Sequence, residues 1–363
     1  MGKDCTFVLA ADIGGTSSRF ALFEEGMFPV PASQIILPTT GYASFRDLLE
    51  AGLDGLGTHR TLAAVLAVAG PVERGRFCLP PNIRHPFDLD ALPPGLLPEH
   101  TLMINDFTAQ AHGCRLFSGQ CPVDVPPGCV ELAARPTILG GSSPGKAGAP
   151  PALDASVGRA DADSVRVVLP GRMDPSLTQA VVGPGTGLGK AALVPDGRGG
   201  YAVCGSEGGH AAFPFNGARE TDFQDFARRA LGEPYVRFES VVSGSGLALV
   251  HRYLMGRDAS AAEVSAELTD DSPVAEWFAR FLGRACRDYV LEVLARGGLY
   301  VSGGVTAKNP MLLSHPAFLS EFRSSATHAD LLAKVPALLV ADQLIGLRGA
   351  AALAWTLVAS RRH

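Results

Sequence analysis

The most constraining feature of the chain is a glycine turn between two apolar segments. Residues 7–23 read FVLAADIGGTSSRFALF. Gly14 and Gly15 can adopt backbone angles closed to other residues and can expose their N–H groups, so the turn can form a concave site for an anion. Asp12 could hold a cation beside that anion. A phosphate with bound Mg²⁺ would supply both the anion and the cation. A long polar hairpin loop is the alternative, because glycine-rich turns are common.

A second glycine turn repeats this order of apolar run, turn and apolar run. Residues 179–194 read QAVVGPGTGLGKAALV. Lys190 is followed by Ala191 rather than Ser or Thr, and Pro184 stands where the Walker pattern requires its first glycine, so a P-loop NTPase is disfavoured. Two such turns about 170 residues apart predict that two halves of the molecule clamp one polyphosphate.

Short apolar runs alternate with segments of helical periodicity along the rest of the chain. The clearest helical segment is 277–294, where apolar side chains recur at three- and four-residue steps, and Gly297 and Gly298 supply its stop signal. Strands alternating with helices predict an α/β protein with a mostly parallel or mixed sheet. A length of 363 residues allows one large or two ordinary domains.

Charge and composition exclude several partners. The net charge of -5 gives no electrostatic footprint for nucleic acid. Glycine, proline or charge interrupts every apolar stretch before the roughly 18 to 20 residues that span a bilayer. The seven cysteines are scattered and never in C-x-x-C spacing, which is typical of reduced thiols. We therefore expect a cytoplasmic protein with neither nucleic acid nor membrane as a partner.

The stretch MINDFTAQ places two polar side chains at the end of an apolar strand. Asn105 and Asp106 follow that strand, where side chains at the carboxyl end of an α/β sheet line the ligand crevice. Asp106 could accept a proton from a substrate hydroxyl during phosphoryl transfer. An Asx cap that starts the following helix is the alternative, and the residues alone leave both open.

The stretch GSEGGHAAF brings a carboxylate close to an imidazole. Glu207 and His210 have the spacing of a helical metal-ligand pair, but Gly208 and Gly209 disfavour a helix and no second His or Cys cluster completes a zinc or di-iron site. On a tight turn the two side chains would point to one locus and suit adjacent hydroxyls of a polyol. Glu239 precedes another Ser/Gly turn and could join them, although a solvated cap is the stronger alternative for it.

Taken in order, these motifs resemble those of the bacterial-type glucokinases, a branch of the sugar kinases with the actin-like ATPase (ribonuclease H-like) fold. The resemblance spans nearly the whole chain and rests on seven motifs, which are DIGGT (12–16), LAVAGPV (66–72), INDFTA (104–109), GPGTGLG (183–189), SEGGH (206–210), ESVVSGSGL (239–247) and VSGGV (301–305).

The resemblance implies two α/β domains with a ligand cleft between them. We expect a small domain of residues 1–116 with 342–363 and a large domain of residues 117–341. Residues 136–163 are rich in Pro, Gly, Ala and Ser without an apolar period, and we expect them to form a flexible insertion.

The resemblance also implies the activity and the residues that carry it. The implied reaction is ATP-dependent phosphorylation of glucose to glucose 6-phosphate in glycolysis, with Asp106 as the base acting on the C6 hydroxyl. The implied glucose contacts are Asn82, Asn105, Asp106, Glu207, His210 and Glu239. The implied nucleotide contacts are Asp12, Gly14, Gly15, Thr16, Gly185, Thr186, Gly187, Gly303, Gly304 and the 346–349 region with Gly349. Asp12 would hold Mg²⁺ through water, and the family often forms homodimers.

One departure from the family pattern and two contrasts with related proteins define the alternatives. The family usually has a Trp three residues after the Asn that matches Asn82, whereas this chain has His85, so a kinase for another hexose or amino sugar is the alternative. No cysteine cluster follows His210 as it does in the ROK sugar kinases, so we expect no structural zinc. A non-catalytic sugar sensor of the same fold is disfavoured, because such regulators usually carry a DNA-binding module ahead of DIGGT and eleven residues precede Asp12.

Overall fold

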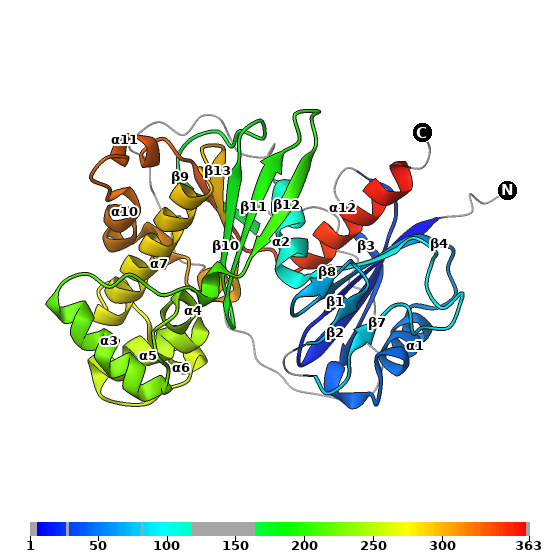
Figure 1. Ribbon diagram of the computed structural model, residues 1–363, viewed down its shortest axis with the longest axis horizontal. Helices are drawn as coiled ribbons and strands as arrows, with labels where there is room; N and C mark the ends of the chain where they lie inside the picture. The colour runs from blue at the N-terminus through cyan, green and yellow to red at the C-terminus, as the bar shows by residue number, and fades with distance from the viewer. Residues whose placement is uncertain (1–5, 27–28, 81–82, 118–163, 361–363) are drawn as a thin grey trace, which may run out of the picture.

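The computed structural model describes residues 6–26, 29–80, 83–117 and 164–360. The expected insertion at 136–163 lies outside these residues. Two mixed β-sheets dominate the architecture, and helices cover them (Figure 1).

The first sheet has the strand order β3-β2-β1-β4-β8. Strands β1, β2 and β3 are antiparallel neighbours, whereas β4 and β8 run parallel to β1. Alternate β1 residues face opposite sides, because side chains in a strand alternate: Leu9 packs on the side of α1, and Val8 packs on the side of α12. The elements of this half are β1 (Phe7–Ile13), β2 (Ser17–Phe23), β3 (Pro31–Pro38), α1 (Phe45–Leu56), β4 (Thr61–Val68), β8 (Thr101–Asn105), α2 (Asp106–Arg115) and α12 (Ile345–Ala359).

A small three-stranded ribbon lies in the connection between β4 and β8. Its strands are β5 (Val72–Glu73), β6 (Phe77–Cys78) and β7 (Phe87–Asp88), paired in that order. The ring of Phe87 stacks on that of Phe45 in α1 with centroids 4.5 Å apart, so the ribbon is packed against the first half.

The second sheet repeats the order of the first and adds one strand. Its order is β12-β11-β10-β13-β14-β9, with antiparallel β10, β11 and β12 followed by parallel β13 and β14. The strands are β9 (Val165–Leu169), β10 (Gln179–Pro184), β11 (Leu188–Pro195), β12 (Tyr201–Ser206), β13 (Gly298–Val301) and β14 (Ala337–Val340). The β1–β2 and β10–β11 turns therefore occupy equivalent places, which confirms the repetition inferred from the two glycine stretches.

Helices α2 and α12 lie between the two sheets (Figure 1). Cys114 of α2 packs in one cluster with Val181 and Tyr300 of the second sheet. A Cβ on Gly349 of α12 would overlap the backbone of α2 at Ala109, so glycine permits the close approach of these helices.

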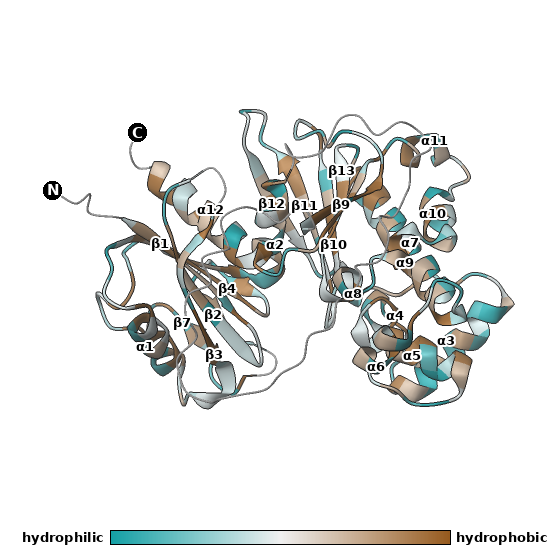
Figure 2. Cartoon of the chain, turned by 180° about the vertical axis from the view of Figure 1, so that it is seen from behind, coloured by the Kyte–Doolittle hydropathy of each residue, from teal (hydrophilic) through white to brown (hydrophobic). Residues whose placement is uncertain are grey.

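The remaining helices cover the outer face of the second sheet and form its largest core. They are α3 (Ala218–Leu231), α4 (Phe238–Val241), α5 (Gly244–Met255), α6 (Ala261–Glu267), α7 (Pro273–Glu292), α8 (Gly304–Lys308), α9 (Met311–Ser314), α10 (Pro316–Arg323) and α11 (Ala329–Leu332). Figure 2 shows hydrophobic strands inside and hydrophilic stretches on the outer helices α3 and α10. Among the described residues, no helix is long and apolar enough to cross a membrane.

Helix α7 confirms the helix expected over 277–294, although it begins four residues earlier and ends two residues earlier. Ser272 caps it by accepting from the Val274 N–H at 3.2 Å, and Pro273 occupies its first position, which suits proline because no intrahelical donor is needed there. Strand β13 starts directly at Gly298.

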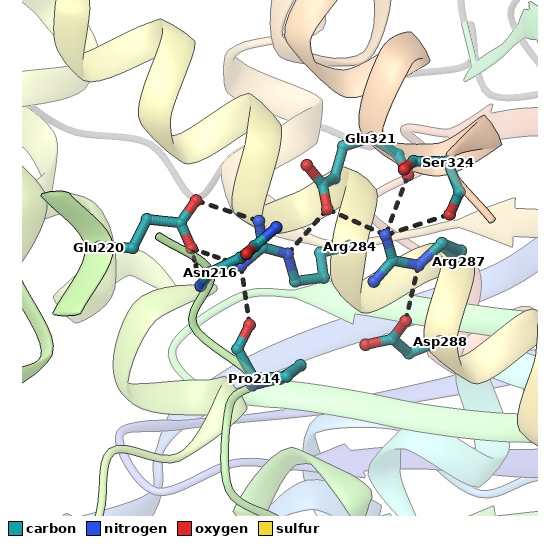
Figure 3. A network of polar contacts seen from close by, with 8 residues as sticks. All are labelled: Pro214, Asn216, Glu220, Arg284, Arg287, Asp288, Glu321 and Ser324. Atoms are coloured by element: carbon teal, nitrogen blue, oxygen red, sulfur yellow. Dashed lines mark hydrogen bonds and ion pairs between the residues drawn. The ribbon is translucent and has the colours of Figure 1, made fainter. Parts of the chain in front are cut away.

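A buried ion-pair network anchors α7 (Figure 3). Arg284 is 3% exposed and donates to Glu220 at 3.0 Å through Nη2 and to Glu321 at 2.8 Å through Nε. Its Nη1 also donates to the Pro214 carbonyl at 2.7 Å. These partners satisfy a charge that would otherwise be costly to bury.

Candidate active site

A cavity of about 250 Å³ opens where the two sheets and the two central helices meet. Its polar and glycine lining comes from β1, β2, α2, the β13–α8 and β14–α12 connections and the first turns of α8 and α12. The residues are Asp12, Arg19, Asp106, Gln110, Ser302, Gly303, Gly304, Asp342, Gln343 and Gly346. Residues more than 300 positions apart in the sequence therefore face one space.

The junction of β8 and α2 combines the two interpretations left open for Asn105 and Asp106. Asn105 is the cap: its Oδ1 accepts from the N–H groups of Phe107 and Thr108 at 2.9 and 3.1 Å, while its Nδ2 donates to the Gly70 carbonyl at 3.1 Å. Asp106 starts the helix and lines the cavity, with Oδ1 accepting from the Phe107 N–H at 2.8 Å. The cap thus fixes the position of the cavity carboxylate.

Two carboxylates that line the cavity, Asp12 and Asp106, have raised pKa values. Burial raises the pKa of Asp106 to about 6, the negative charge of Asp12 adds to the rise, and the Phe107 N–H opposes it. Burial also raises the pKa of Asp12, and the nearby Arg19 opposes that rise. A carboxylate with a pKa near 6 is mostly ionised at neutral pH and still basic, which suits a general base.

The first glycine turn is held by a buried threonine that no motif indicated. Thr39 donates through Oγ1 to the Gly14 carbonyl at 2.7 Å, and its N–H donates to the Thr16 carbonyl at 3.0 Å. Neither Gly14 nor Gly15 has a positive φ, so the expected use of left-handed backbone angles is wrong. A Cβ on Gly14 would instead lie 3.2 Å from the Ser17 carbonyl oxygen, so space explains the glycine there.

The start of α2 packs against the second glycine turn. A Cβ on Gly183 or Gly189 would overlap the ring of Phe107. Glycine at both positions therefore leaves the space that the Phe107 side chain occupies next to Asp106. The turn itself closes with the Gly185 N–H donating to the Gly187 carbonyl at 2.8 Å, and Thr186 lies between them. Close packing therefore couples the expected base to the second phosphate turn.

The expected sugar contacts lie around the same turn. Glu239 accepts from the Leu188 N–H at 3.2 Å through Oε2. A Cβ on Gly209 would overlap the Leu188 carbonyl oxygen, so the segment from Glu207 to His210 also packs on that residue. This segment is a short 3-10 helix, Gly208–His210, and its Glu207 Oε2 lies 3.6 Å from His210 Nε2. The side chains converge as expected, but none of them is among the lining of the 250 Å³ cavity.

The structure places only part of the expected nucleotide contacts at the cavity. Asp12, Gly303 and Gly304 line it, as does Gly346, whereas residues 14–16 and 185–187 are not among its lining. Gly349 lies one turn further along α12 and contacts the backbone of α2. Asn82 lies outside the described residues.

Two charged residues of the cavity were not predicted. Arg19 lines it and donates through Nη1 to the Gln343 carbonyl at 3.0 Å. Asp342 accepts from the Leu344 N–H at 2.8 Å, and its Oδ2 lies 2.7 Å from Nε of the buried Arg348. The basic residue after DIGGTSS is a signal that could have indicated Arg19, whereas nothing local distinguishes Asp342.

The fold and the site together define a class of protein. Two mixed sheets of related strand order, two equivalent glycine turns and a buried carboxylate that lines a cavity are the features of a sugar kinase with the actin-like ATPase fold. In the part of the chain that the structure describes, no group of three or more His, Cys, Asp or Glu side chains is arranged to hold a metal ion.

Comparison with known proteins agrees with this class. The family model described as Glucokinase matches residues 9–145 and 151–357, and the chain belongs to the glucokinase family. The chain is 31% identical over 361 residues to a glucokinase of Sinorhizobium fredii (strain NBRC 101917 / NGR234). The alignment covers 96% of this chain and 91% of that protein.

Solved structures confirm the expected fold class. A glucokinase from an Antarctic psychrotroph has a TM-score of 0.72 and 26% identity, with 98% of this chain and 100% of that chain covered. A ROK family glucokinase from Streptomyces griseus, in complex with glucose and AMPPNP, has a TM-score of 0.58 and 17% identity, with 96% and 99% covered.

Proposed function

We propose that the protein transfers the γ-phosphoryl group of ATP to the 6-hydroxyl of glucose. The observation that carries this proposal is the carboxylate of Asp106, which lines a cavity bordered by both halves of the molecule and has a pKa of about 6. Membership of the glucokinase family and the neighbour described with glucose and AMPPNP support the choice of sugar and donor.

Asp106 acts as the base in this proposal. It accepts the proton of the sugar hydroxyl as the oxygen attacks phosphorus, an effect typically worth ~10² to 10⁴ in rate. Asn105 contributes by capping α2, because its hydrogen bonds to two N–H groups keep the first turn of the helix in place.

The glycine turns supply positions for the phosphates. Phosphoryl transfer passes through a loose transition state whose charge lies on phosphoryl oxygens, so positioning and electrostatic stabilisation provide most of the catalysis. The resemblance assigns Gly14 to Thr16 and Gly185 to Gly187 to the phosphates, and Arg19 adds a cation at the cavity. Gly303, Gly304 and Gly349 are assigned to the nucleotide side by the resemblance alone.

The cavity lining fits a hard divalent cation. Asp12 brings a carboxylate to the cavity, and oxygen donors are what Mg²⁺ prefers. Asp12 would hold Mg²⁺ through water, and the ion would neutralise charge on the transferred phosphate.

Glu207, His210 and Glu239 are proposed to read the sugar hydroxyls. A site built from hydrogen-bonding groups rejects analogues that lack the hydroxyls far more strongly than an apolar pocket does. The family resemblance also supports placing the enzyme in the cytoplasm, as a homodimer that serves glycolysis.

A coupled assay of ADP release tests the proposal. Purified protein with ATP and Mg²⁺ should turn over faster with glucose than with mannose, fructose or N-acetylglucosamine, as judged by kcat/KM. A higher kcat/KM for another sugar would replace glucose as the substrate. ATP turnover that no sugar stimulates would refute the assignment as a sugar kinase.

A further inference from the structure

A polar cluster beside the second glycine turn is held together by Arg237, which no sequence motif marks. Nη1 of Arg237 lies 2.9 Å from His210 Nδ1 and donates to Glu239 Oε1 at 3.1 Å. Nε and Nη2 donate to the two carboxylate oxygens of Glu233 at 3.2 and 2.6 Å. A bidentate arginine–carboxylate pair of this kind fixes the plane of the guanidinium group.

Backbone pairing brings Arg237 to His210. The Phe213 N–H donates to the Val236 carbonyl at 2.9 Å, and the Phe238 N–H donates to the Ala211 carbonyl at 2.9 Å. These bonds flank the bridge between Ala212 and residue 237. The contact between the two side chains therefore follows from the register of the two segments.

The contact with Arg237 decides which ring nitrogen of His210 carries the proton. A guanidinium group has five N–H donors and no acceptor, so His210 Nδ1 has to accept from it. The proton of the imidazole is then on Nε2, which lies on the side of Glu207 at 3.6 Å from its Oε2. His210 thus presents a donor where Glu207 presents an acceptor, a combination that suits adjacent hydroxyls.

Arg237 also joins this pair to the second phosphate turn. The Oε2 atom of Glu239 accepts from the Leu188 N–H, while its Oε1 accepts from Arg237. A Cβ on Gly187 would overlap the Glu239 carboxylate. The orientation of Glu239 is therefore fixed from both sides.

We propose that Arg237 is a positioning residue for the sugar subsite: it holds His210 in the Nε2–H tautomer and orients Glu239 as an acceptor. The inference rests on the proposed function, in which both residues contact sugar hydroxyls. The substrate class that this arrangement fits is a neutral sugar with adjacent free hydroxyls, because donor and acceptor atoms lie side by side.

Steady-state kinetics of Arg237→Met test the proposal with the sugar that the wild-type enzyme phosphorylates best. KM for that sugar should rise about tenfold, the loss expected for one or two misdirected hydrogen bonds, while KM for ATP and kcat stay within about twofold. Arg280→Met is the matched control, because Arg280 forms an ion pair with Glu276 at 2.6 Å on the same large half; it should leave all three constants unchanged.

A double-mutant cycle separates positioning from a general structural role. In a His210→Ala background, the effect of Arg237→Met on KM for the sugar should shrink at least about threefold, since coupled residues are non-additive. Equal effects in both backgrounds, or a loss confined to kcat or KM for ATP, would overturn the proposal. Arg237→Lys retains one donor group and should therefore restore part of the increase in KM for the sugar. It replaces Arg237→Met in the test if the methionine variant unfolds.

The tautomer of His210 gives a readout that needs no activity. Long-range ¹H–¹⁵N spectra, with His210→Gln to assign the signal, should show Nε2–H in the wild-type protein and loss of that preference in Arg237→Met. An Nδ1–H signal in the wild-type protein would refute the inference. Absence of sugar phosphorylation with the expected tautomer would refute the proposed function alone.

Discussion

The buried carboxylate of Asp106 should make the protein less stable at neutral pH than it would be with an amide in its place. Asp106→Asn removes the charge and retains an oxygen that can accept from the Phe107 N–H, as the present Oδ1 does at 2.8 Å. The wild-type pKa rises from 3.8 to about 6 on folding, chiefly through burial. The folded state therefore binds the Asp106 proton more tightly than the unfolded state does. The protonated carboxyl contributes to the free energy of unfolding at low pH, and this contribution is lost as the pH rises from about 4 through about 6.

The size of the effect follows from that shift. At 1.36 kcal/mol per pKa unit, a rise from 3.8 to about 6 corresponds to about 3 kcal/mol. Water in the cavity screens part of it, so we expect the unfolding free energy of Asp106→Asn minus that of wild type to increase by about 1–3 kcal/mol between pH 4 and pH 7.5.

Urea unfolding at several pH values measures this difference. The titrations are run without nucleotide, sugar or divalent cation, and fluorescence and circular dichroism should report the same transition. Asp225→Asn, at an exposed position of α3, is the control and should show a much smaller change with pH. A flat difference for Asp106→Asn, or a variant less stable than wild type at pH 7.5, would refute the electrostatic argument.

Three further predictions concern packing and charge. Gly349→Ala should lower the free energy of unfolding by about 1–3 kcal/mol because its methyl group overlaps α2; Gly346→Ala in the same helix meets atoms no closer than 3.7 Å and should be neutral or stabilising by up to about 1 kcal/mol, so equal losses would contradict the packing argument. Arg284→Met should cost about 3–5 kcal/mol in urea unfolding, because the buried Glu220 carboxylate loses its ion-pair partner; a loss under 1 kcal/mol would show that the network is dispensable. Asp12→Asn should lower the pKa of Asp106 and shift the acidic limb of the kcat/KM profile to lower pH; a shift to higher pH would contradict the proposed coupling.

Local sequence patterns predicted the elements of the fold and part of the site. The strands around both glycine turns and the helix containing Trp277 follow from hydrophobic periodicity, because burial of one face depends on residues close in sequence. Asp106 was predicted because polar residues at the end of a parallel strand face the ligand crevice. Both sheets repeat one topology, which explains why two separated glycine stretches look alike.

Long-range contacts account for what the sequence could not indicate. Thr39 holds the first glycine turn through its side chain, which donates to the Gly14 carbonyl from the end of a different strand. Arg237 meets His210 only through the register of two segments in the large half. None of these residues stands in a motif, since their roles depend on the tertiary arrangement. The roles of Glu207 and Gly349 toward ligands stay predictions.

The catalytic claim is tested most directly by the turnover of Asp106→Ala beside its ligand affinities. Calorimetry should show glucose and ATP binding within about tenfold of wild type, because neither ligand depends mainly on this carboxylate. The kcat for glucose phosphorylation should fall by ~10² to 10⁴, the usual contribution of a general base. A kcat within about tenfold of the wild-type value, with both ligands still bound, would contradict the assignment of Asp106 as the base.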